Sequence, residues 1–409
     1  MLPRLRPVLI SAPLLLSLAS PAFGQFRPTL NVNCTRGDSL ASAVSFAFPN
    51  TLINVKGTCA GPINITTDGL QLNAVGAASI NGGGKNAVTV TGAHKVTLTG
   101  LAISAGAVGV VAQNGAQVTL QNDTVSGNSG SGILALGTSS LTVSGGSAQG
   151  NAVHGIDVEA SSALVVSGSY AVTGNGVFGI NVNNGSSITL TGATLSVTQN
   201  TLGIQLGTNA SGFLDGASTL TASQNFSDGI TIVSGSHVVD FGGTIQTLYN
   251  AIHGISLNSK AGLDLDAGSQ VTSNYNGADG VHLEQSSELT VFNNPNFSGN
   301  PRTTLLTVTN NTNDGIAVLT GSQVLDDNYA AITAQANTLF GIAVDNGSSV
   351  TFGQTIPVSG VQSIVNGNTV DVILTFGSRM DTGANLSVGT LECDRTVILR
   401  GATGFTCPR

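Results

Sequence analysis

The reactive side chains of this sequence gather in one stretch. Charged residues make up only 8% of the 409 residues, yet acids and histidines recur between positions 228 and 315. A carboxylate beside an imidazole can accept or donate a proton, so this stretch contains candidates for acid–base catalysis on a glycosidic bond. The alternative role is local, because Asp before Gly is a common turn residue and a histidine can fill a corner. The candidates are Asp228, His253, Asp279, His282 and Glu284.

The same stretch offers groups for binding. Asp279 and Asp314 could hold Ca²⁺ through their carboxylate oxygens, which makes calcium the one cofactor the sequence suggests. Tyr249 and Tyr275 could provide a platform for sugar rings. Arg302 lies in the longest turn of the sequence, and long turns on a rigid scaffold often carry function.

A second polar group is expected on exposed strand faces earlier in the chain. It could form hydrogen bonds with an extended glycan, or it could be an ordinary solvated strand face. Its members are Asp157, Glu159, Asn181, Asn183 and Gln205.

These residues are brought into line by a repeat. A Gly followed by Ile or Val recurs at steps of 23 to 35 residues, and apolar, variable and apolar residues follow it, as in Ile156-Asp157-Val158. Two further short apolar segments complete each unit, and no helical period lies between them. This pattern predicts an all-β fold, a parallel β-helix, whereas a leucine-rich repeat would need Leu at fixed offsets and a helical segment. The repeat glycines are Gly109, Gly132, Gly155, Gly179, Gly203, Gly229, Gly254, Gly280, Gly315 and Gly341.

Stacked turns convert repeat positions into columns, with neighbours about 4.8 Å apart. The position before the repeat Gly places Asp228, His253, Asp279 and Asp314 on consecutive turns. A second column of asparagines is expected to form an internal hydrogen-bonded ladder, with a row of sugar-binding amides as the alternative. Its members are Asn128, Asn151, Asn175, Asn200, Asn225, Asn250, Asn276, Asn311 and Asn337.

Both ends of the coil have their own signals. Asp38 could cap a short helix in which Leu40, Ala43, Val44 and Ala47 share a face that covers the core. Four cysteines allow three connectivities, and Cys34–Cys59 with Cys393–Cys407 is favoured because the two groups lie far apart. The expected organisation is a signal peptide over 1–24, an N-terminal segment with the capping helix over 25–50, the β-helix over 51–369 and closing strands over 370–409.

The N-terminus predicts export. Arg4 and Arg6 precede a short apolar run, and Ala22-Phe23-Gly24 supplies a cleavage site before Gln25. No later run is long enough to span a membrane. The formal net charge is −8, which argues against a nucleic-acid partner. We therefore expect a secreted or periplasmic protein.

The export signal, capping helix and Asn-x-x-x-Gly-Ile-x-Val turns resemble bacterial right-handed parallel β-helix repeat proteins of the pectin-lyase-like superfamily, over about residues 31–409. Many members of that superfamily act on polysaccharides. Their Gly-His-Gly, Arg-x-Lys and Asp-Pro-His-Glu patterns do not occur in this sequence, and Asp326-Asp327 is an isolated acidic pair. The favoured interpretation is a protein that binds carbohydrate or acts at the cell surface. The alternative is a polysaccharide-acting enzyme, a hydrolase rather than a lyase, with its site on turns 228–315.

Overall fold

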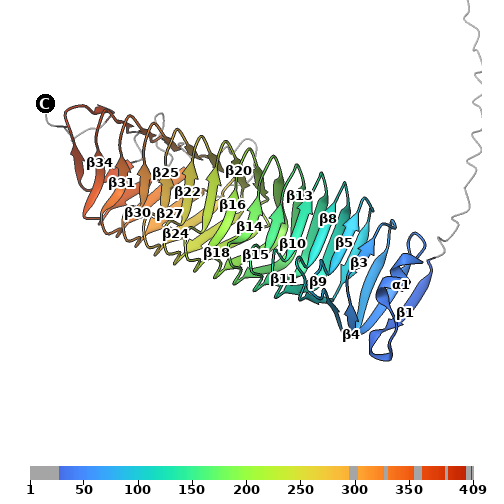
Figure 1. Cartoon of the computed structure of the whole chain (residues 1–409). Helices are drawn as coiled ribbons and strands as arrows, with labels where there is room; N and C mark the ends of the chain where they lie inside the picture. The colour runs from blue at the N-terminus through green and yellow to red at the C-terminus, as the bar shows by residue number, and fades with distance from the viewer. Residues whose placement is uncertain are drawn as a thin grey trace, which may run out of the picture.

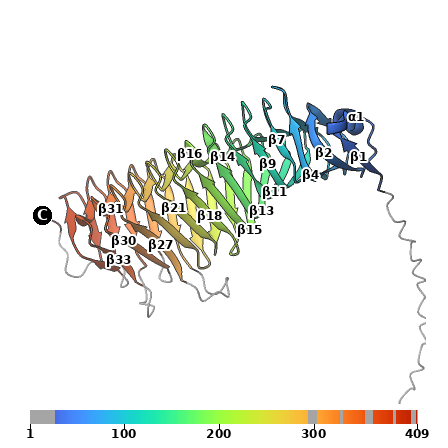
Figure 2. The ribbon, with the colours of Figure 1, turned by 90° about the horizontal axis from the view of Figure 1, so that it is seen from below.

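The structure is a computed structural model that describes residues 27–293, 303–326, 330–353, 362–382, 386–401 and Cys407. The chain winds into an elongated coil, with α1 and β1 at one end and β34 near the other (Figure 1). The view from below shows the same strands stacked side by side along the axis (Figure 2). Neighbouring turns pair in parallel, as Ile133 with Ile156 and Ile156 with Ile180. The predicted parallel β-helix is confirmed.

Sheet B, as we name the smaller sheet, contains the ten strands at the repeat glycines and four further strands at its two ends. It has fourteen strands in the described residues, one for each turn. These strands are β3 (Ile63–Ile65), β5 (Val88–Thr91), β8 (Val110–Gln113), β10 (Ile133–Leu136), β12 (Ile156–Val158), β14 (Phe178–Val182), β16 (Leu202–Leu206), β19 (Ile230–Val233), β22 (Ile255–Asn258), β25 (Val281–Leu283), β28 (Ile316–Val318), β31 (Phe340–Val344), β34 (Val370–Leu374) and β37 (Leu391–Cys393).

Sheet A contains the other two predicted segments of each turn. In several turns these segments merge into one long strand, as in β15, and in later turns they remain separate. The described strands are β1 (Thr29–Asn33), β2 (Leu52–Ala60), β4 (Gln71–Asn81), β6 (Val96–Thr99), β7 (Ala102–Ser104), β9 (Gln117–Ser126), β11 (Ser140–Gln149), β13 (Ala163–Thr173), β15 (Ser187–Thr198), β17 (Ser211–Leu214), β18 (Thr219–Ser223), β20 (His237–Phe241), β21 (Thr244–Leu248), β23 (Gly262–Asp266), β24 (Gln270–Asn274), β26 (Glu288–Val291), β27 (Thr304–Thr309), β29 (Gln323–Asp326), β30 (Ala330–Gln335), β32 (Ser349–Thr351), β33 (Ser363–Asn366), β35 (Arg379–Asp381), β36 (Leu386–Val388) and β38 (Ile398–Arg400).

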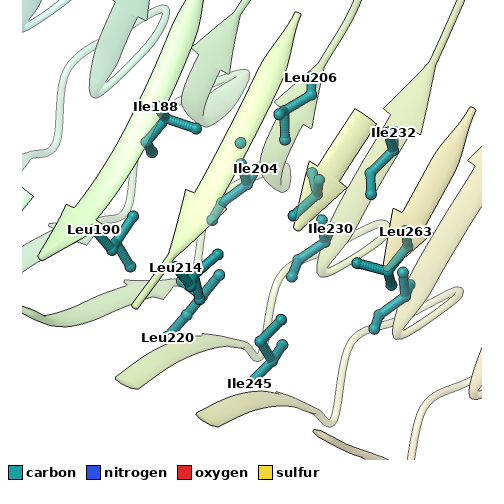
Figure 3. A pocket seen from close by; sticks show the side chains of 13 residues that line it. Ile188, Leu190, Ile204, Leu206, Leu214, Leu220, Ile230, Ile232, Ile245 and Leu263 are labelled. Carbon is teal, nitrogen blue, oxygen red and sulfur yellow. The ribbon is translucent and has the colours of Figure 1, made fainter. Parts of the chain in front are cut away.

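The core is a continuous column of aliphatic side chains between the two sheets. Alternate residues of each strand point inward, as in β12, where Ile156 and Val158 are fully buried. Gly212 interrupts the column, because it lies in register between Ile188 and Val238. An apolar cavity of about 30 Å³ remains beside it, and Figure 3 shows the aliphatic side chains around this cavity.

The repeat glycines are required by close packing. A Cβ built at Gly179 would lie 2.5 Å from Val197 Cγ1, 2.7 Å from Asn200 Nδ2 and 2.7 Å from the carbonyl oxygen of Gly203. Backbone and ladder side chain therefore occupy the space that any larger residue would need.

The asparagine column is an internal ladder, as predicted. From Asn151 onward each Oδ1 accepts two hydrogen bonds from the preceding rung: Asn250 Oδ1 accepts the backbone N–H of Asn225 at 3.1 Å and its Nδ2–H at 3.0 Å. Asn250 Nδ2 in turn donates to Asn276 Oδ1 at 3.1 Å. The nine predicted asparagines are buried, so they are not sugar-binding amides. Asn368 adds a tenth rung, which accepts from Asn337.

The N-terminal end is covered by the helix α1 (Leu40–Ser45), which buries Leu40 and Val44. The prediction that Asp38 caps this helix is wrong. Ser39 is the N-cap, since its Oγ accepts the N–H of Ser42 at 3.2 Å, whereas Asp38 Oδ2 accepts the N–H of Asn33 at 2.8 Å. The short 3₁₀ helix η1 (Cys34–Arg36) precedes α1 in the chain and contacts β2.

Both predicted disulfides are present. Cys34 bonds Cys59 at the start of the coil, and Cys393 bonds Cys407 at its end. The predicted closing strands β34 and β38 pair with β31 and β35, so they continue sheets B and A. Among the described residues no helix has the length and apolarity needed to cross a membrane. The predicted signal peptide, residues 1–24, lies outside the described residues.

Candidate functional site

The side chains that precede the repeat glycines connect neighbouring turns throughout the predicted site. Each side chain accepts a hydrogen bond from the backbone of the next turn. Asp228 Oδ1 accepts the N–H of His253 at 3.0 Å, and His253 Nδ1 accepts the N–H of Asp279 at 3.3 Å. Asp279 Oδ1 accepts the N–H of Asp314 at 3.1 Å. The predicted stacking of these four residues is therefore present, together with the turn chemistry that was its alternative explanation.

One carboxylate oxygen remains for other contacts, and two histidines converge on it. Asp279 Oδ2 lies 2.8 Å from His282 Nδ1 and 3.3 Å from His253 Nδ1. The two imidazoles stack with their centroids 4.4 Å apart and an interplanar angle of 24°. The side chains are 7%, 17% and 19% exposed for Asp279, His282 and His253. We call these three residues the His-Asp cluster.

The other two catalytic candidates lie beside this cluster. Glu284 Oε2 is 3.9 Å from His282 Nε2, and its Oε1 accepts a hydrogen bond from Asn258. Asp228 Oδ2 accepts the hydroxyl of Thr231 at 3.1 Å. Sequence reasoning missed Asn258 and Thr231. Their only signal is the repeat register, which places both on sheet B strands with outward polar residues.

The cluster separates the pKa values of its two histidines. Burial and the nearby His282 lower the pKa of His253. Burial also acts against protonation of His282, but the hydrogen bond and charge of Asp279 outweigh it and raise its pKa. Burial and the charge of Asp279 raise the pKa of Asp314 to about 7. The cluster therefore shifts the pKa values of two neighbouring imidazoles in opposite directions.

The two tyrosines form a stacked pair on the same turns. Their ring centroids lie 5.1 Å apart with an interplanar angle of 11°, and the residues are 56% and 48% exposed. Because the rings face each other, they do not form one flat platform, and each leaves a single face for a ligand. Both residues have a φ of 58°, in the left-handed region, where other turns use Gly127, Gly150 and Gly174.

The second polar strip differs from its prediction. Asp157 and Asn181 point away from the core but are buried, at 8% and 4% exposure, because they pair along their row through an Asn181 Nδ2–Asp157 Oδ1 bond of 2.8 Å. The expectation that they form an exposed binding strip is wrong for these two residues. Asn183 Oδ1 accepts the N–H of the neighbouring Asn184 at 2.8 Å, while Glu159 and Gln205 are half-buried. Arg302 lies outside the described residues.

A separate imidazole–carboxylate pair lies on sheet A. His237 Nε2 is 3.1 Å from Asp264 Oδ2, with side chains 48% and 30% exposed. The pair borders a pocket of about 180 Å³ together with Lys260 and Glu288. This pair brings together two titratable side chains, whereas the His-Asp cluster brings together three.

Comparison with known proteins agrees with the geometry. Residues 63–237 match the family model of a right handed beta helix region. The match covers less than half of the chain, and the described residues on both sides of it continue the same parallel β-helix. This β-helix has the fold expected from the resemblance to the pectin-lyase-like superfamily.

Solved structures with a similar fold share little sequence with this β-helix. A periplasmic alginate epimerase is 12% identical, over 91% of this chain and 83% of that chain, with a TM-score of 0.43. The A-module of a mannuronan C-5 epimerase from Azotobacter vinelandii is 12% identical over 89% and 94%, with a TM-score of 0.41. A surface adhesin of Streptococcus pneumoniae is 10% identical over 87% and 86%, with a TM-score of 0.28. No curated protein sequence matches this chain.

Proposed function

We propose that this β-helix is an exported protein that binds a polysaccharide on the outer surface of turns 228–315. The carrying observation is the placement of Tyr249 and Tyr275. Each is an exposed aromatic side chain, and each stands four residues before a member of the His-Asp cluster, His253 or Asp279. An apolar ring face near several hydrogen-bonding groups suits a sugar, which has apolar C–H faces and polar hydroxyls.

The two tyrosines occupy a backbone position at which glycine is the least strained residue. A non-glycine residue in the left-handed region costs about 1–2 kcal/mol relative to its preferred conformations. Three turns of the same coil carry glycine at this position, whereas Gln199, Gln224 and Ala336 adopt the left-handed conformation there as the tyrosines do. Replacing either tyrosine by glycine is therefore expected to remove the ring without straining the backbone.

The charge of the chain favours a neutral polymer. It has 21 acidic and 13 basic residues, and a net negative surface repels polyanions. Two disulfides with no free cysteine among the described residues suit an oxidising compartment. We therefore propose a secreted or periplasmic location.

The test measures binding of the oxidised mature chain to a panel of neutral and acidic polysaccharides. Tyr249→Gly and Tyr275→Gly remove the rings and relieve the backbone strain, so weaker binding cannot be attributed to unfolding. Gln224→Gly is the matched control, since Gln224 has a φ of 57° in the same column one turn earlier. We expect at least tenfold weaker binding for each tyrosine variant and an unchanged affinity for the control. Absence of binding, or an equal loss in Gln224→Gly, would refute the proposal.

A polysaccharide-acting enzyme is the second candidate, favoured by the convergence of His253 and His282 on one oxygen of Asp279. The same panel is scored for shortening of the polymer chains. Cleavage that is lost in Asp279→Asn, but retained in Asp264→Asn on sheet A, would establish this candidate in place of binding alone.

A further inference from the structure

We propose that the His-Asp cluster is a binding site for a divalent transition-metal ion, with Zn²⁺ as the representative. His253, Asp279 and His282 each offer one ligand atom, and these atoms lie within 4.8 Å of one another. This inference is independent of polysaccharide binding, since it concerns an ion and uses no tyrosine.

The distances fit a small tetrahedral ion. With metal–ligand bonds of about 2.0–2.1 Å, neighbouring donors around tetrahedral zinc lie about 3.4 Å apart. The Asp279 Oδ2 atom is 3.3 Å from His253 Nδ1 and 2.8 Å from His282 Nδ1. Small rotations of the two imidazoles would therefore allow all three donors to face one ion. The ion would replace the 3.3 Å bond that His253 Nδ1 accepts from the backbone of Asp279.

The donor set selects the class of ion. Two imidazole nitrogens and one carboxylate suit zinc, copper, nickel or iron, whereas calcium takes six to eight oxygen ligands. The calcium site suggested by Asp279 and Asp314 would use Asp279 as an oxygen donor, but one of its oxygens already accepts the backbone N–H of Asp314. Only Oδ2 faces the imidazoles, so a nitrogen-rich site is the better fit.

The surroundings hold these donors in place. The Asp314 N–H fixes the Asp279 carboxylate, and Asp228 anchors the backbone of His253. His282 Nε2 faces Glu284 at 3.9 Å, and metal-binding histidines commonly donate their second N–H to a carboxylate. Partial exposure of both imidazoles leaves room for water as a fourth ligand.

Other histidines of the described residues lack this arrangement. His94 faces Asp68 at 3.5 Å and His237 faces Asp264 at 3.1 Å, each as a pair of one imidazole and one carboxylate. The His-Asp cluster is the one group of three potential ligands found among the described residues. His237 therefore provides a matched control for adventitious binding to a surface histidine.

The experiment titrates the metal-free, oxidised mature chain with ZnCl₂ by isothermal calorimetry, with no polysaccharide present. One ion is expected to bind per chain. His282→Ala and Asp279→Asn should each weaken binding at least 100-fold, and Glu284→Gln about tenfold through the orientation of His282. His237→Ala should bind as the wild type does. Circular dichroism confirms that each variant is folded.

The visible spectrum of bound Co²⁺ provides a second readout, which reports the geometry of the site rather than the affinity for Zn²⁺. Co²⁺ bound in a tetrahedral site with two nitrogen donors should give visible absorption bands, and these should vanish in His253→Ala and persist in His237→Ala. The proposal is overturned if the wild type binds no Zn²⁺ at millimolar concentration, or if His237→Ala weakens binding as much as His282→Ala. Tyr249→Gly tests independence, because it should lower polysaccharide binding and leave Zn²⁺ affinity unchanged.

Discussion

A buried carboxyl group in the core predicts a measurable dependence of stability on pH. Asp240 points inward from β20, is fully buried, and lies in register between Leu214 and Leu265. Burial raises its pKa from 3.8 to about 7, although hydrogen bonds from Gly243 and Ser269 act in the opposite direction. We predict that Asp240→Asn removes this pH dependence.

The direction of this pH dependence follows from the protonation of Asp240 in the folded and the unfolded chain. Below pH 3.8 the carboxyl is protonated whether folded or unfolded, so it has no effect on the free energy of unfolding. Between pH 3.8 and about 7 the unfolded chain ionises while the folded chain retains the proton, which favours unfolding. At 1.36 kcal/mol for each pKa unit, the loss reaches roughly 4 kcal/mol above pH 7. Asparagine has nearly the same shape and never ionises, so the variant avoids this loss.

The assay is urea unfolding of both proteins, followed by far-UV circular dichroism from pH 4.5 to pH 8 with the disulfides intact. The variant should gain about 3 kcal/mol relative to the wild type across this interval. Asp215→Asn is the control of opposite sign. Burial opposes ionisation of Asp215, but hydrogen bonds from Ser218, Gly192 and Ala217 outweigh it and lower the pKa. This variant should therefore be less stable than the wild type by an amount that stays nearly constant from pH 4.5 to pH 8, because the contribution of Asp215 changes only below about pH 3.8. A difference between Asp240→Asn and the wild type that stays constant with pH would refute the reasoning.

Two further predictions concern the turn that holds the asparagine ladder and the packing of glycines in the coil. Asn250→Ala should lower the free energy of unfolding by about 3 kcal/mol, because the buried N–H and Nδ2–H of Asn225 both lose their acceptor. Asn310→Gly, an exposed change at the same corner, should alter it by less than about 0.5 kcal/mol. Gly212→Ala should stabilise the coil by about 1 kcal/mol, since its neighbours can shift into the cavity. Gly179→Ala should instead destabilise it by about 2 kcal/mol through overpacking. Urea unfolding measures all four, and equal effects of the two glycine substitutions would contradict the packing argument.

The repeat made most of the fold predictable. Each turn repeats the same local pattern, so Gly179-Ile180 alone identifies a strand, and the constant register then aligns every column. The ladder was predicted except for its last rung. Asn368 was missed because Asp371 occupies the position of the repeat Gly, in register with Gly341. The Asp371 side chain can occupy this position because, among the described residues, no asparagine of a following turn fills the same space.

The candidate site was predictable only as a set of columns. That Asp228, His253 and Asp279 would stack follows from spacing, but the direction of each side chain does not. Their bonds to the backbone of the next turn depend on the corner geometry, and so does the turn of His282 towards Asp279. Burial of Asp157 was missed for a similar reason. An outward strand position is exposed only if the neighbouring side chains leave it open, and Asn181 covers it.

The asparagine ladder also gives the coil a direction. In the rungs from Asn151 to Asn337 one Nδ2–H donates to the next asparagine towards the C-terminus and the other donates to a backbone carbonyl of the preceding turn, as in Asn250. The side-chain carbonyl oxygens all accept from the preceding rung, so the bonds along the ladder share one direction, as the bonds of an α-helix do. The donor end lies at Asn368, where the backbone N–H and Nδ2–H both donate to Asp371 Oδ1 at 3.0 Å. Burial works against ionisation of this carboxyl, but the hydrogen bonds from Asn368 and Thr390 prevail and lower its pKa. Asp371 therefore does for a ladder of side chains what an acidic N-cap does for an α-helix: it ends the series with a negative charge on its last free donors.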